Sequence, residues 1–139
     1  MENFEYYAPT KVFFGKDTQM LTGKAINQFG GKKVLIHYGG QSAKKSGLLN
    51  QVCQCLDKEG IEYVMLGGVV PNPRLSLVRK GIELCKNENV DFILAVGGGS
   101  VIDSSKAIAY GIANDCDVWD FYSRVSQAKA CAPVGVVLT

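Results

Sequence analysis

Two periods of apolar residues alternate along the chain, one typical of buried strands and one typical of helices. Short apolar runs predict strands at 33–38, 61–66, 91–96 and 134–138, and the first, which is continuous and stops at glycine, is typical of a strand covered on both faces. Between them, apolar residues recur with helical spacing over 48–56, 75–82 and 100–110. A further helix is predicted from Asp17 to Gly30. This alternation requires parallel strands, right-handed crossovers and helices on both faces of the sheet.

The first fifteen residues have a different pattern. Phe4 to Tyr7 is aromatic, Pro9 breaks the run, and "KVFFG" follows at 11–15, so we expect two short strands that can pair as a hairpin. Together these patterns predict a three-layer, Rossmann-like α/β domain with a mostly parallel sheet and an N-terminal strand pair at its side. The apolar residues of that pair would form a sheet edge, and such edges tend to find partners.

Composition narrows the class of protein. The 139 residues suffice for one compact domain, and 47% hydrophobic with 20% charged residues is a globular balance. The net charge of +2 is scattered, which argues against a nucleic-acid partner. The N-terminus lacks the features of a signal peptide, and no apolar run reaches the roughly 18 residues that a membrane span needs. We therefore expect a soluble, cytoplasmic protein.

Cysteine usage agrees with a reducing compartment. The five cysteines are odd in number, form no CxxC pair and mostly lie in apolar segments, so we expect a reducing cytosol, with Cys53 and Cys55 as core residues rather than ligands. Cys53 and Cys55 are separated by one residue, but with His37 as the single histidine they make a poor zinc set, and no metal site is assigned. We expect His37 to be a partly buried strand residue. The sequence ends at Thr139, directly after an apolar strand, which leads us to expect a longer protein.

Three consecutive glycines, Gly97 to Gly99, stand between a predicted strand and a predicted helix. In an open parallel sheet, ligands bind at the carboxyl ends of the strands, and a helix N-terminus without nearby Cβ atoms favours a phosphate. Ser100 can cap the helix or bind a phosphate oxygen. Asp103 is expected in the first turn, where it would either stabilise the helix dipole or bind the far part of a dinucleotide. Because Ile102 replaces the third glycine of the usual fingerprint, both a phosphate site and a tight structural turn stay open.

Several motifs in order resemble those of the iron-containing (group III) alcohol dehydrogenases, in particular the butanol dehydrogenase and aldehyde reductase branch. They are "PTKVFFG", "KVLIHYGGQSAKKSGLL", "GGVVPNP", "DFILAVGGGSVIDSSKAIA", "DVWDF" and "PVGVVLT". The resemblance implies an NAD(P)-dependent oxidoreductase that interconverts short primary alcohols, such as butanol, and aldehydes by metal-assisted hydride transfer. Residues 1–139 would be its N-terminal dinucleotide-binding domain. The Fe(II) or zinc would lie in a following helical domain, so this chain supplies neither a catalytic residue nor a metal ligand.

The same resemblance implies a set of cofactor-binding residues. The pyrophosphate would bind the glycine loop, Asp103 would lie toward the nicotinamide, and Thr139 would begin a further cofactor loop. Asn72, between two prolines, would lie in a cofactor-side loop, although a rigid turn explains it equally well. The implied set is Gly39, Gly40, Gln41, Ser42, Asn72, Gly97, Gly98, Gly99, Ser100, Asp103 and Thr139.

The loop after the first predicted core strand bears on the choice of cofactor. NAD-preferring members of the family have an aspartate there, whereas residues 38–42 contain no carboxylate, and Lys44 and Lys45 follow. This pattern favours NADP(H) over NAD(H), although the two lysines are also what a solvated helix start would contain. Gln41 stands where the branch commonly has a third glycine.

The resemblance also implies a homodimer that forms through the N-terminal strand. Two other functions remain open from the sequence. One is a relative of glycerol dehydrogenase or dehydroquinate synthase, which would share the fold and the glycine motif but act on another substrate. The other is a stand-alone nucleotide-binding module.

Overall fold

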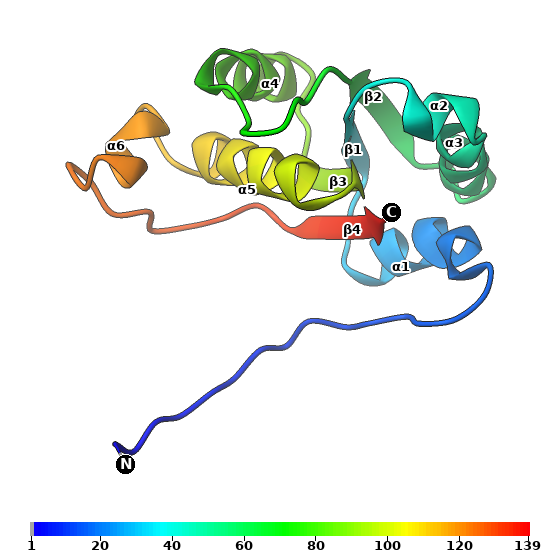
Figure 1. Cartoon of the computed structure of the whole chain (residues 1–139), viewed down its shortest axis with the longest axis horizontal. Coiled ribbons are helices and arrows are strands. Elements are labelled where there is room, and N and C mark those ends of the chain that lie inside the picture. The colour runs from blue at the N-terminus through cyan, green and yellow to red at the C-terminus, as the bar shows by residue number, and fades with distance from the viewer. Residues whose placement is uncertain (1) are drawn as a thin grey trace.

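Four parallel strands form the centre of the molecule, in the order β2-β1-β3-β4 (Figure 1). The computed structural model describes residues 2–139 and confirms the predicted α/β class. The strands are β1 (Lys33–Tyr38), β2 (Glu62–Leu66), β3 (Phe92–Gly97) and β4 (Val134–Leu138). All four lie within one residue of the predicted ranges. The central strands β1 and β3 are buried, whereas the outer strands β2 and β4 are only partly buried.

Helices cover both faces of the sheet, as the alternation predicts. One face packs against α1 (Thr22–Gln28) and α3 (Leu48–Lys58), and the core there includes Leu56 and Ile36, both fully buried. The opposite face packs against α4 (Leu75–Asn87) and α5 (Gly99–Ala113), where Ile93 and Ile108 are fully buried. The sheet is therefore the middle of three layers.

Three short elements complete the order of the chain. The helix predicted from Asp17 divides into a 3-10 turn, η1 (Thr18–Leu21), followed by α1. The single-turn helices α2 (Ser42–Lys45) and α6 (Trp119–Tyr122) were not predicted. Four residues are too few for a helical period to show in the sequence.

The predicted N-terminal strand pair is wrong for the described residues. No strand precedes Lys33 within 2–139, and the segment before η1 runs away from the body of the molecule (Figure 1). Its apolar side chains are exposed, Phe14 at 98%. An isolated two-stranded hairpin has only marginal stability in water, and Pro9 lacks the backbone N–H that strand pairing would use. The apolar pattern therefore does not suffice to form a strand pair without a neighbouring sheet.

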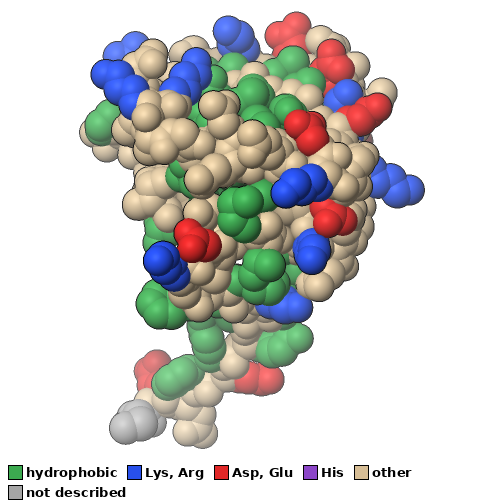
Figure 2. All heavy atoms as spheres, turned by 90° about the vertical axis from the view of Figure 1, so that its right-hand side faces the viewer, with side chains coloured by type: hydrophobic (Ala, Val, Ile, Leu, Met, Phe, Trp, Pro, Cys, Tyr) green, Lys and Arg blue, Asp and Glu red, His purple; other side chains and the backbone are tan. Residues whose placement is uncertain are grey.

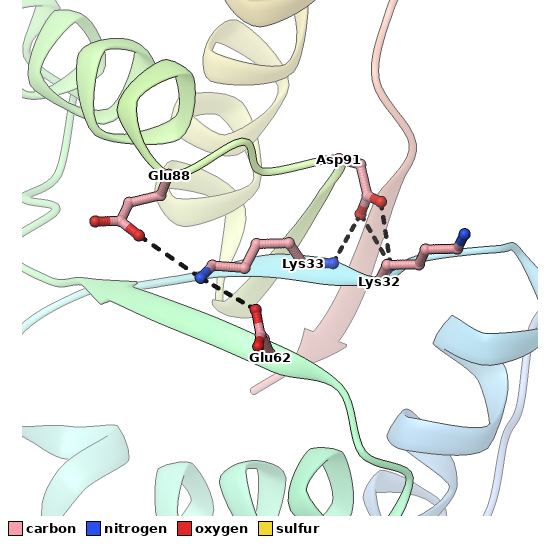
Figure 3. Close-up of polar contacts among 5 residues, drawn as sticks. All are labelled: Lys32, Lys33, Glu62, Glu88 and Asp91. Atoms are coloured by element: carbon pink, nitrogen blue, oxygen red, sulfur yellow. Dashed lines mark hydrogen bonds and ion pairs between the residues drawn. The ribbon is translucent and has the colours of Figure 1, made fainter.

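Asp91 aligns the amino ends of the two central strands (Figure 3). Its carboxylate accepts hydrogen bonds from the backbone N–H of Lys32, at 3.0 and 3.2 Å, and from that of Lys33, at 3.1 Å. The Asp91 N–H in turn donates to the Lys33 carbonyl at 3.0 Å. The Lys33 ammonium lies 3.4 Å from Glu62 and 3.6 Å from Glu88, pairs that contribute about 1 kcal/mol or less because they are exposed. The register of β1 and β3 is therefore fixed at the edge opposite the glycine loop.

All five cysteines are free thiols. Cys55 and Cys85 are buried, as expected of core cysteines, and burial raises the pKa of the Cys85 thiol to about 12. Cys53, expected in the core, is only partly buried, and Cys131 is exposed. None of the helices formed by residues 2–139 combines the length and apolar character that a bilayer crossing requires.

Candidate functional site

The loops that follow the strands meet along one edge of the sheet. Tyr38 is paired with Val96, and Gly97 with Leu138, so the ends of β1, β3 and β4 lie side by side. The Thr139 N–H donates to the Gly97 carbonyl at 3.2 Å. These contacts bring the loop after β1, the glycine loop and Thr139 together, as the sequence predicts for a parallel sheet.

The three glycines of the loop do different things. Gly97 has φ +156°, and a Cβ there would lie 2.6 Å from the Val101 Cγ2 atom, so the fold itself requires this glycine. Gly98 has an ordinary extended conformation, with φ −97° and ψ −162°, and a Cβ there would have no atom within 4 Å. Gly99 is equally open. The fold therefore explains Gly97 as a structural turn, whereas neither backbone conformation nor packing requires glycine at positions 98 and 99.

The loop after β1 has the same property. Gly40 avoids the left-handed region and a Cβ there would meet no atom within 4 Å. Gly39 lies between two other elements, because its Cβ would be 3.5 Å from the Val69 carbonyl oxygen and 3.8 Å from the Val101 side chain of α5. The edge of the sheet where the loops after β1, β3 and β4 meet forms a rim. Open backbone borders this rim from both the β1 loop and the start of α5.

The N-terminus of α5 supplies the polar groups of this rim. Gly98 is its N-cap, no side chain caps the helix, and the first N–H groups of any α-helix lack intrahelical acceptors. Ser100 is half-buried beside them. Positive helix dipole, free amides and open space together suit a phosphate group. Asp103 is the fifth residue of the helix, so the prediction that it lies in the first turn is wrong. Its carboxylate is therefore not placed in the turn where it would stabilise the helix dipole.

Asp103 and Asn72 lie beside the rim on the face covered by α4 and α5. Asp103 lines a groove of about 220 Å³ with Pro73, Trp119 and Tyr122. Asn72 is exposed and has φ +58°, the conformation expected of a rigid turn between two prolines. Both residues therefore belong to the wall of this groove or to the loop that leads into it.

The lysines after the β1 loop lie on α2, which begins at Ser42, with Gln41 as its N-cap. Lys44 and Lys45 are both exposed, and the Lys44 ammonium lies 5.4 Å from the centre of the Tyr38 ring. Figure 2 shows how positive side chains gather in places on one face of the molecule, among apolar and acidic ones. No carboxylate is present in the loop or in α2.

Two parts of the rim were missed by the sequence interpretation. Gly67 and Gly68 follow β2; a Cβ on Gly67 would collide with the Tyr38 ring, and the Gly68 N–H donates to the Gly39 carbonyl at 2.9 Å. A glycine pair directly after a strand was the available signal. The other is His37, which is fully buried rather than partly buried.

His37 is fully engaged by hydrogen bonds. Its Nδ1 lies 2.7 Å from the Leu66 carbonyl oxygen, and its Nε2 lies 2.7 Å from the Ser104 Oγ. Burial lowers the pKa of the imidazole, an effect that the bond to Leu66 partly opposes. Among the residues that the structure describes, no three His, Cys, Asp or Glu side chains are grouped to hold a metal ion.

Comparison with known proteins identifies what shares this arrangement. The sequence pattern of a family described as iron-containing alcohol dehydrogenase matches residues 9–139. Probable NADH-dependent butanol dehydrogenase 2 of Bacillus subtilis is 51% identical over 139 residues, which are 100% of this chain and 35% of that protein. NADPH-dependent aldehyde reductase YqhD of Escherichia coli is 37% identical over 142 residues, covering 100% of this chain and 36% of its own length.

A solved structure agrees in three dimensions. The crystal structure of NADH-dependent butanol dehydrogenase A from Thermotoga maritima superposes with a TM-score of 0.97 at 46% identity, over 100% of this chain and 35% of that one. The chain thus spans about a third of the length of the relatives that it matches.

Proposed function

The chain belongs to the iron-containing alcohol dehydrogenase family, and on that premise we propose that residues 1–139 are the dinucleotide-binding domain of an enzyme that interconverts short primary alcohols and aldehydes. The observation that carries this proposal is the open backbone at Gly40, Gly98 and Gly99, which the fold does not need. When bound, the nicotinamide would accept a hydride from the alcohol or give one to the aldehyde. The butanol dehydrogenases and aldehyde reductase among the relatives favour such substrates over those of glycerol dehydrogenases or dehydroquinate synthases.

Different residues of this chain would bind different parts of the cofactor. The backbone of Gly98 and Gly99 and the Ser100 hydroxyl would bind the pyrophosphate at the start of α5, where amides and dipole are favourable. The loop from Gly39 to Ser42 would hold the adenosine ribose. Thr139, bonded to Gly97, would continue the rim toward the nicotinamide, and Asp103 and Asn72 would border it.

The metal of this family would be held elsewhere. Residues 2–139 offer no suitable cluster, and both nitrogens of His37 already have partners in the fold. We therefore propose that Fe(II) or zinc is bound by a helical domain outside residues 1–139, where it would assist the hydride transfer. In this proposal the present chain contributes cofactor binding and no catalytic residue. The free state of all five thiols is in keeping with a cytoplasmic enzyme.

We further propose that NADP(H) binds more tightly than NAD(H). No carboxylate near the β1 loop would repel a 2′-phosphate, and Lys44 and Lys45 are close enough along the chain to attract one. The relatives include proteins named as NADH-dependent, one named as NADPH-dependent and one named as NADP-dependent, so the argument for the preference comes from the residues of this chain.

Calorimetric titration of the chain with NADPH and with NADH tests both the site and the preference. We expect NADPH to bind about fivefold more tightly, since an exposed ion pair contributes about 1 kcal/mol or less. Lys44→Ala should reduce the difference, whereas Lys58→Ala, at the far end of α3, should not. Tighter binding of NADH would overturn the preference. A folded sample that binds neither nucleotide would overturn the proposal of a cofactor domain.

We also propose a homodimer that forms through the N-terminal segment. Large apolar side chains there are exposed, Phe4 at 87%, Tyr6 at 82% and Phe14 at 98%, and the backbone of the segment has no strand partner within the described chain. Association would bury this apolar surface and pair the extended backbone. Native mass spectrometry is expected to show a dimer that is lost on combining Tyr6→Lys with Phe14→Lys. A wild-type monomer, or a dimer unaffected by both changes, would contradict the proposed interface.

A further inference from the structure

A buried polar contact joins three elements just below the candidate site. His37, on β1, is fully buried, and Ser104, on α5, is 1% exposed. Because the Leu66 carbonyl can only accept, the Nδ1 of His37 must carry the hydrogen in this contact. In the neutral ring Nε2 is then an acceptor, so the Ser104 hydroxyl donates to it. Each of these polar atoms therefore has one defined hydrogen-bonding role, and burial, which lowers the pKa of the His37 imidazole, favours the neutral ring that this arrangement needs.

The contact lies where it can act on the site. His37 directly precedes Tyr38 and the open loop after β1, and Leu66 is the last residue of β2. Ser104 is the sixth residue of α5, one to two turns after the glycine loop. Within residues 2–139, the bond from Ser104 to His37 is the one side-chain hydrogen bond that links α5 to a strand. The contacts of α5 with the strands are otherwise apolar packing. A backbone hydrogen bond from the Ala132 N–H to the Ala109 carbonyl, at 3.2 Å, ties the later part of α5 to the segment before β4, away from the glycine loop.

We propose that His37 and Ser104 are positioning residues for the cofactor, and that their hydrogen bond holds the amides of α5 in a fixed place relative to the loop after β1. This inference rests on the proposed function. A dinucleotide must contact both places at once, its ribose at the β1 loop and its pyrophosphate at α5. A small tilt or slide of α5 changes the distance between these two contacts while each contact by itself stays intact.

This role differs from mere stabilisation in a measurable way. Loss of the Ser104 hydroxyl should lower the affinity for a ligand that bridges both places about five- to tenfold, which corresponds to one hydrogen bond of about 1 kcal/mol. Inorganic pyrophosphate, which uses the α5 amides alone, should bind as before. A change that simply destabilised the fold would weaken both ligands by the same factor.

The neighbouring serine provides a matched control. Ser105 is also fully buried on α5, but its Oγ has no hydrogen-bond partner in the described part of the chain. Ser105→Ala therefore removes the same atom from the same helix without touching His37. We expect it to leave both ligands unaffected, and removal of an unpartnered buried hydroxyl should be neutral or stabilising for the fold.

The experiment compares wild type, Ser104→Ala and Ser105→Ala by titration with NADPH and with pyrophosphate, with urea unfolding of each. Ser104→Cys, which keeps a weak donor, is the second variant and should bind NADPH more tightly than Ser104→Ala. The expected result is that Ser104→Ala binds NADPH more weakly than wild type but binds pyrophosphate with unchanged affinity. Equal effects on both ligands, no effect, or the same effect in Ser105→Ala would overturn the positioning role. Failure of wild type to bind NADPH would instead remove the proposed function on which it rests.

Discussion

Replacement of Gly98 by valine is expected to abolish dinucleotide binding while the chain stays folded. The new Cβ meets no atom of the protein within 4 Å and the backbone conformation suits any residue, so the fold has no reason to change. The branched side chain would occupy the space through which the pyrophosphate reaches the amides of α5. Calorimetric titration should show an affinity for NADPH at least about 100-fold lower, which corresponds to about 3 kcal/mol.

The adjacent glycine supplies the opposite result. Gly97→Ala would place a side chain at φ +156° and 2.6 Å from Val101, so it should lower the free energy of unfolding. Gly98→Ala should fall between wild type and Gly98→Val in affinity. If Gly98→Val binds NADPH as wild type does, the loop is only a turn, and if it unfolds the chain, the open space has been misjudged.

The central strands β1 and β3 were predictable because burial of both faces requires a run of consecutive apolar residues. β3, "FILAVG", is buried throughout, and its short length and its end at glycine distinguish it from a buried helix. The N-terminal segment also carries aromatic and apolar residues, interrupted by Glu5, Pro9 and Lys11, but forms no strand in the described chain. A strand depends on a neighbour that the local sequence does not specify, which is why the same signal succeeded at 92–97 and failed at 4–15.

The candidate site was located by its glycines but not understood from them. In the sequence, the three glycines at 97–99 are indistinguishable. In the structure, φ and packing against Val101 require a glycine at position 97, whereas neither requires one at 98 or 99. That difference depends on where Val101 lies. The partners of His37 were hidden for the same reason, since Leu66 and Ser104 are 29 and 67 residues away along the chain.

Gly23 allows a test of packing on the other face of the sheet. It lies in α1 where that helix meets α3, and a Cβ there would collide with the Cys55 carbonyl oxygen and lie 2.9 Å from the Glu59 Cγ. In an unobstructed helix, glycine to alanine stabilises by about 1 kcal/mol. Here the obstacle is backbone, which cannot rotate away as a side chain can. We expect Gly23→Ala to lower the free energy of unfolding by about 2 to 3 kcal/mol.

Urea unfolding measures this, and Gly99→Ala is the matched control. Gly99 is also helical, but a Cβ there meets no atom within 4 Å, so its replacement should leave the unfolding midpoint unchanged or raise it. The two variants should also differ in their affinity for NADPH, since Gly99→Ala should weaken NADPH binding and folded Gly23→Ala should not. A higher midpoint for Gly23→Ala would mean that α1 and α3 do not touch there. Opposite responses in stability and affinity would separate the glycines that build this fold from those that its ligand needs.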